Sequence, residues 1–162
     1  MRKALRAAAL ALALTAGVAP LAAPLAARPI EAGKPQTGLK VVPLRIRSAD
    51  GRQHLYKVEV ASTMDQQAHG MMFRTAMPPM TGMIFPMNPP RMAGFWMENT
   101  LIPLDIVFIG ADGQVRNVAA EAVPQSRAQL LSAGPVAAVL ELKGGEAARI
   151  GLKPGDTVDW AK

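Results

Sequence analysis

Residues 94–110 read GFWMENTLIPLDIVFIG, and the segment 104–109 within it is the strongest strand candidate in the chain. Side chains alternate between the two faces of a strand, so Asp105 would share a face with Val107 and Ile109. If both faces are covered, this carboxyl group lies in or at the rim of a core. A buried carboxylate is costly unless it is paired or hydrogen-bonded. The stretch therefore raises the question of which groups would pair with or hydrogen-bond to the carboxyl group of Asp105.

Short apolar or alternating runs, separated by turn signals, recur on both sides of this stretch. We expect strands at 42–46, 54–60, 82–85, 95–98, 104–109, 114–120, 136–142 and 157–160, and short helices at 64–70 and 145–150. This pattern predicts a single all-β domain, a β-sandwich or a flattened barrel, with one or two short helices. Five prolines fall within 73–92, and such density should exclude a central strand there apart from 82–85.

The N-terminus has the order of a secretory signal, with basic residues first, then an apolar core, then small residues. We expect a signal peptide at 1–27, a disordered leader at 28–38 and a single β-rich domain at 39–162. An uncleaved membrane anchor is the alternative, but the run is rich in alanine and broken by Pro20 and Pro24. These features predict a periplasmic or secreted protein without stable membrane insertion after cleavage.

Removing the signal removes three basic residues and no acidic one, so the formal net charge falls from 18 − 12 = +6 to 15 − 12 = +3. This modest charge, without a basic cluster among aromatic residues, argues against nucleic-acid binding. The chain has no cysteine, which excludes disulfides, thiolate nucleophiles and thiolate metal ligands.

Four motifs occur in a distinctive order: HGMMFR at 69–74, GMIF at 82–85, FWMENTLIPLDIVFI at 95–109, and VLEL followed by GLKPGD within 139–156. Together they resemble the family called domain of unknown function 192. That resemblance implies a small, often exported, β-rich single domain, and it implies no particular reaction. The chain departs from the family pattern at His69 and Glu98, where relatives often carry a basic residue.

The polar residues around the opening stretch form the main candidate site. We expect Arg74, Trp96, Asn99, Thr100 and Asp105 to line a shallow pocket for a small polar ligand. The structural alternative is that the carboxyl, amide and hydroxyl groups tie down an irregular connection by bonding to backbone amides, with Arg74 in an ion pair.

Methionine is the other unusual feature, since nine of the ten methionines fall within 64–97. Met77, Met80 and Met83 recur at every third residue, and thioethers are soft ligands suited to Cu(I), with one of the two histidines completing the site. The alternatives are core packing or an adaptable surface for a protein partner.

The sequence thus predicts an exported, non-catalytic binding module for a small polar ligand or a protein partner. One alternative is periplasmic Cu(I) binding through the methionine-rich loop. Another is a small hydrolase in which Asp105 and Glu98 act as an acid/base pair. We assign no catalytic residue, because the sequence shows no nucleophile arrangement or phosphate loop, and His54 and His69 do not have the spacing of metal ligands.

Overall fold

The computed structural model describes residues 33–161. Within them, the strands are β1 (Val41–Arg47), β2 (Gln53–Val60), β3 (Thr81–Arg91), β4 (Gly94–Phe95), β5 (Leu104–Ile109), β6 (Val115–Ala122), β7 (Leu130–Leu131), β8 (Val136–Lys143) and β9 (Thr157–Trp160), and the helices are α1 (Met64–His69) and α2 (Glu146–Ile150). The predicted signal peptide and residues 28–32 of the predicted leader lie outside the described residues. Neither described helix is long and apolar enough to cross a membrane.

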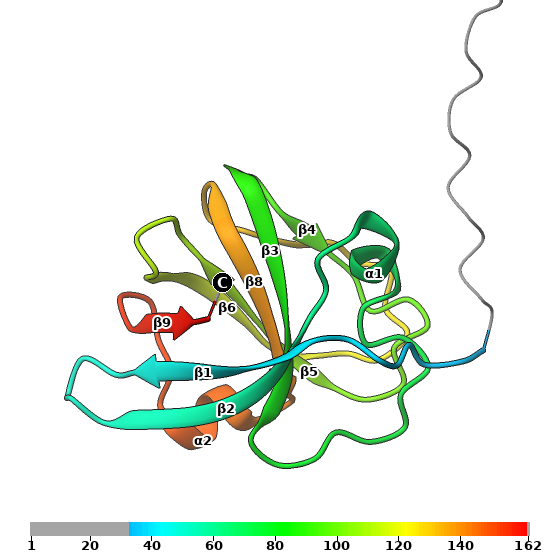
Figure 1. Cartoon of the computed structure of the whole chain (residues 1–162), viewed down its shortest axis with the longest axis horizontal. Helices are drawn as coiled ribbons and strands as arrows, with labels where there is room; N and C mark the ends of the chain where they lie inside the picture. The colour runs from blue at the N-terminus through cyan, green and yellow to red at the C-terminus, as the bar shows by residue number, and fades with distance from the viewer. Residues whose placement is uncertain (1–32, 162) are drawn as a thin grey trace, which may run out of the picture.

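Seven strands form one sheet in the order β6-β5-β8-β3-β2-β1-β9 (Figure 1), and β4 pairs with β7 in a separate two-stranded sheet. Neighbouring strands of the large sheet are antiparallel except β2 and β3, which are parallel. The two end strands approach each other at a single bridge, between Gln114 and Thr157. The all-β prediction is confirmed, and the curled but unclosed sheet is consistent with a sandwich or a flattened barrel.

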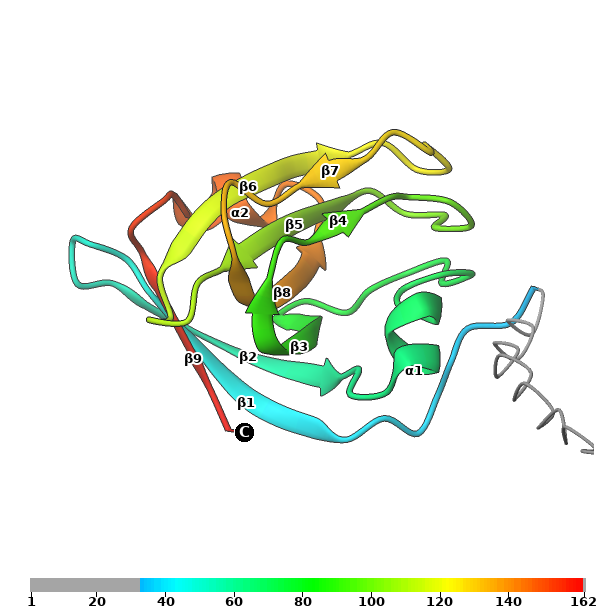
Figure 2. The same cartoon turned by 90° about the horizontal axis from the view of Figure 1, so that it is seen from above.

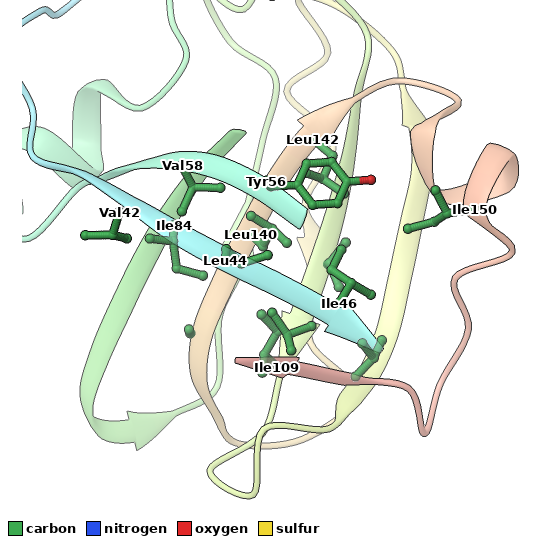
Figure 3. Close-up of a cluster of buried hydrophobic side chains, with 14 residues drawn as sticks. Val42, Leu44, Ile46, Tyr56, Val58, Ile84, Ile109, Leu140, Leu142 and Ile150 are labelled. Atoms are coloured by element: carbon green, nitrogen blue, oxygen red, sulfur yellow. The ribbon is translucent and has the colours of Figure 1, made fainter. Parts of the chain in front are cut away.

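The inner face of the curled sheet carries one hydrophobic core. All seven strands contribute to it, as does α2 through Ile150. Figure 3 shows Leu44, Leu140 and Ile109 gathered between the strands, with Ile150 entering from the helix. The alternation of apolar residues in β1, which reads exposed-buried along its whole length, is what places one face of that strand in this core.

A second core covers the outer face of β3, β5 and β8. Phe85, Ile106 and Phe108 project from these strands, and the segments after β2 and before β5 pack over them with residues such as Met71 and Met97. Figures 1 and 2 place α1 and β4 on this side of the molecule, away from β9. Because β5 and β8 are buried on both faces, their sequences are almost continuously apolar.

Two strand predictions were wrong. β3 is the middle strand of the sheet and runs through Pro86 to Arg91, although proline density argued against a central strand there. β2 pairs only with the proline-free half of β3, Thr81–Ile84, and the β8 ladder shifts register between Pro86 and Arg91. The prolines therefore fall where few ladder amides are needed.

The strand expected at 95–98 is the second error, because β4 covers only Gly94–Phe95. After it the chain turns: the amide of Thr100 donates to the carbonyl of Met97, at 3.0 Å, and Asn99 has a positive φ of 58°.

The first helix was predicted correctly. Thr63 caps α1, and its hydroxyl accepts from the amide of Gln66 at 3.2 Å, completing a capping box.

Candidate functional site

Asp105 is completely buried and its carboxyl group is satisfied by backbone amides. Oδ1 accepts from the amide of Glu121 at 2.7 Å and of Gly145 at 3.2 Å. Oδ2 accepts from the amide of Ala147 at 2.6 Å. These bonds join β5 to β6 and to the start of α2, which answers the question raised by the opening stretch. They match the structural alternative for Asp105.

The acid/base pair of the hydrolase alternative is not assembled in this structure. Asp105 has no exposed surface from which to contact a substrate. Glu98 is partly exposed and pairs with Arg127, at 2.6 Å.

Arg74 lies elsewhere, in an ion pair with Glu59 at 2.5 Å. Its guanidinium also donates to the carbonyl of Gln36, at 3.2 Å. The Gln36 side chain in turn donates to the carbonyl oxygens of Gln66 and Gly70. Arg74 therefore ties the segment before β1 to the sheet and to the region of α1, and it does not meet Asp105 in an ion pair.

Three of the predicted site residues lie near one another along the chain, and two of them line a common cavity. Trp96 is half exposed and Thr100 is buried, and both line this cavity. Asn99 lies between them in the sequence, but it shapes the turn. Its backbone carbonyl accepts from the amide of Phe73 at 2.8 Å, and its side-chain amide donates to the sulfur of Met72 at 3.9 Å. The five predicted residues are thus divided among four environments.

The three methionines of the predicted Cu(I) site are also separated. Met77 and Met83 are buried in the outer core. Met80 is partly exposed, and its sulfur accepts from Arg149 at 3.5 Å. The structure therefore does not gather these three sulfurs into one site, and Cu(I) binding stays a prediction.

The cavity shared by Trp96 and Thr100, called the Glu141 pocket below, has a volume of about 270 Å³. It is lined by residues 67–72, residues 91–96, Phe85, Met87, Thr100 and Glu141. The walls thus come from α1 and the turn after it, from the end of β3 and from β4. This volume is close to the lower end of the range usual for small-molecule sites, roughly 300–1,000 Å³.

Glu141 is the residue of this pocket with the most unusual environment. It is 5% exposed, and its Oε2 atom has no hydrogen-bond partner among residues 33–161. In the sheet it lies between Met83 of β3 and Ile106 of β5, both fully buried. Burial raises the pKa of Glu141 to about 8, although the positive charge of Arg74 acts in the opposite direction.

Sequence reasoning did not select Glu141, although a signal was present. The motif VLEL at 139–142 places this acid in an apolar run. One acid inside a doubly buried strand is the same anomaly that drew attention to Asp105. A buried carboxyl with a strongly raised pKa that lines a cavity is a candidate functional group.

Comparison with known proteins places the chain in a family. The model of DUF192, described as "Uncharacterized ACR", matches residues 45–160. The chain belongs to the DUF192 family. This confirms the resemblance carried by the motifs at 69–74, 82–85 and 95–109.

Two crystal structures are similar to this DUF192 protein. A Novosphingobium aromaticivorans protein of unknown function is 49% identical, with a TM-score of 0.74, and the match covers 83% of this chain and 98% of that one. A Sinorhizobium meliloti protein described as a "putative transcription regulator" is 39% identical, with a TM-score of 0.75, covering 77% of this chain and 97% of that one. No curated protein matches the chain.

The geometry at Asp105 predicts a stability defect when it is replaced. Asp105→Asn keeps the shape of the side chain but replaces one accepting oxygen with a donor, which leaves a backbone amide without its acceptor. We expect the free energy of unfolding, measured by urea denaturation, to fall by about 1–3 kcal/mol. Asp159→Asn, at an exposed position in β9, is the matched control and should change it little. Equal effects of the two substitutions would contradict this role.

The environment of Glu141 predicts an unusual pH dependence of stability. Its pKa rises from 4.5 to about 8 on folding, so between these values the unfolded chain has lost a proton that the folded chain retains. The free energy of unfolding therefore falls as pH rises through this window, by about 1.4 kcal/mol per unit of pKa difference. Glu141→Gln should flatten the fall and raise the melting temperature at pH 8.

The measurement is thermal unfolding of both proteins from pH 5 to pH 9. Glu121→Gln removes an exposed carboxyl group and is expected to follow the unmodified protein. If the curves of Glu141→Gln and the unmodified protein run parallel over the whole range, the carboxyl group of Glu141 is not held neutral by the fold.

Proposed function

We propose that this DUF192 protein is an exported, non-catalytic binding module that takes a small polar ligand in the Glu141 pocket. The observation that carries the proposal is the carboxyl group of Glu141, which is buried, lines the cavity and lacks a partner for Oε2 within the described chain. A buried polar atom without a partner costs stability. A ligand that hydrogen-bonds to this oxygen would remove that cost on binding.

The rest of the pocket suits a small ligand held by a few polar contacts. Phe85, Met87 and Phe95 provide apolar lining, and Thr100 provides a hydroxyl. Ligand sites are commonly of this kind, concave and largely apolar with a small number of polar groups that fix orientation. Trp96 is 50% exposed and lines the same cavity, so a bound ligand would cover part of its indole ring.

Export is supported by the N-terminal sequence, in which basic residues precede an uncharged run from Ala7 to Ala27. The chain also lacks cysteine, so the binding site contains no thiol or disulfide whose state would depend on the compartment. An extracytoplasmic binding module is therefore our proposal for where the pocket works, with the ligand taken from outside the cytoplasm.

Soft-metal binding is retained as an outcome of the test. The pocket is lined by Met71, Met72, Met87 and Met92, which are different methionines from those predicted. His69 lines it too, and its buried Nε2 atom has no partner among the described residues. Thioethers with an imidazole are suited to Cu(I), so Ag(I), which is stable in air, belongs among the probes.

The test uses the tryptophan at the pocket. Trp160→Phe leaves Trp96 as the single tryptophan, and its emission then reports on the cavity. We expect at least one member of a panel of small polar molecules and Ag(I) to change this emission with saturation. Saturation by Ag(I) alone would favour the metal alternative over an organic ligand.

A blocking variant provides the control. Ala68 lines the cavity on the exposed side of α1, and Ala68→Leu adds bulk there without burying a polar group. We expect it to weaken binding at least tenfold while leaving the melting temperature unchanged. Ala128→Leu, in an exposed loop, should leave binding intact. A panel in which nothing saturates the Trp96 signal would contradict the proposed function.

A further inference from the structure

The Glu141 pocket contains one acidic and one basic side chain that form no ion pair with each other within the described residues. Glu141 lies between buried apolar residues of the sheet. Arg91, at the end of β3, is exposed and lines the same cavity. Within residues 33–161 no ion pair or hydrogen bond engages the Arg91 side chain. By contrast, Arg74 and Arg127 are held by Glu59 and Glu98.

Each of these groups favours a ligand atom of the opposite charge. A cationic nitrogen next to Glu141 would stabilise the ionised carboxylate and donate to the unsatisfied Oε2 atom. Arg91 offers a planar guanidinium, which binds carboxylates with two parallel hydrogen bonds. A ligand with only one charge would leave one of the two protein groups unpaired. Matching both gives electrostatic complementarity and fixes the orientation of the ligand.

The size and walls of the cavity limit what lies between the two charges. The volume of about 270 Å³ suits a small metabolite. Met72 and Phe95 line the space together with Trp96, so an aliphatic portion of the ligand would meet apolar surface. Aromatic faces also attract cationic nitrogens.

We propose that the Glu141 pocket binds a small zwitterion, with its cationic nitrogen at Glu141 and its anionic group at Arg91. This inference rests on the proposed function and specifies the chemical class of its ligand. Free amino acids, whose ammonium group can donate to Oε2, belong to this class.

A matched set of probes tests each charge separately. Leucine carries both charges, leucinamide carries only the cation and N-acetyl-leucine carries only the anion. With titration calorimetry at pH 7, we expect leucine, or β-alanine in its place, to bind at least tenfold more tightly than its singly charged analogues. Because Glu141 is protonated before the ligand arrives, binding should release up to about one proton, seen as heat that depends on the buffer.

Substitutions in the pocket assign each charge to its partner. Arg91→Gln should reduce the affinity for the zwitterion at least tenfold and leave that for the amide analogue unchanged. Glu141→Gln should also reduce the affinity for the zwitterion at least tenfold, but it should leave the affinity for the N-acetyl analogue unchanged. It should abolish proton release. Arg45→Gln, at an exposed arginine of β1 that is not part of the pocket lining, is the control and should alter none of these values.

The outcomes separate this inference from the proposed function. If a singly charged analogue binds as tightly as its zwitterion, or if neither leucine nor β-alanine binds, the inference is wrong. Saturation of the Trp96 signal by another small molecule would then leave the proposed function standing. Without any such saturation, both proposals fail together.

Discussion

The carboxyl group of Asp105 joins three segments of the chain that are far apart in sequence. β5 supplies the side chain, while the amides come from Glu121 in β6 and from Gly145 and Ala147 at the start of α2. Opposite Asp105 the β5–β6 pairing shifts register, so β6 carries an extra residue there, as in a β-bulge. α2 begins where the third amide is bound, and through Ile150 it closes the inner core. The end of the sheet near α2 therefore depends on these three hydrogen bonds.

Glu141 is the counterpart of Asp105 on the other face of the same two strands. In the β5–β8 ladder, Asp105 lies opposite Leu142 and Glu141 lies opposite Ile106, so the two acidic side chains project from opposite faces. Both are buried, but the fold surrounds Asp105 with amides and leaves Oε2 of Glu141 without a partner in the described chain. Natural proteins depart from complete satisfaction of buried polar groups mainly at functional sites. This contrast separates the residue that holds the fold from the residue we propose to bind the ligand.

Much of the fold follows from local signals in the sequence. β5 and β9 have the predicted bounds, and the capping box at Thr63 starts α1, because alternation and capping act over a few residues. The path of β3 through the prolines was missed, since it depends on how β8 pairs with it. The candidate site was predicted only in part. Trp96 and Thr100 do line a cavity. Whether backbone amides satisfy a buried carboxyl group depends on contacts between residues far apart in the sequence, such as Asp105 and Ala147, and no local pattern encodes such contacts.

Both proposals depend on the carboxyl group of Glu141, which lines the cavity, lacks a partner for Oε2 within the described chain and has its pKa raised by burial. The most direct test is a ¹³C NMR titration of the Glu141 side-chain carboxyl in the free protein, assigned with Glu141→Gln. We expect a midpoint near 8, well above the ordinary value of 4.5. A midpoint near that ordinary value would mean that the carboxyl group is solvated or paired in solution. The observation that carries both proposals would then be lost.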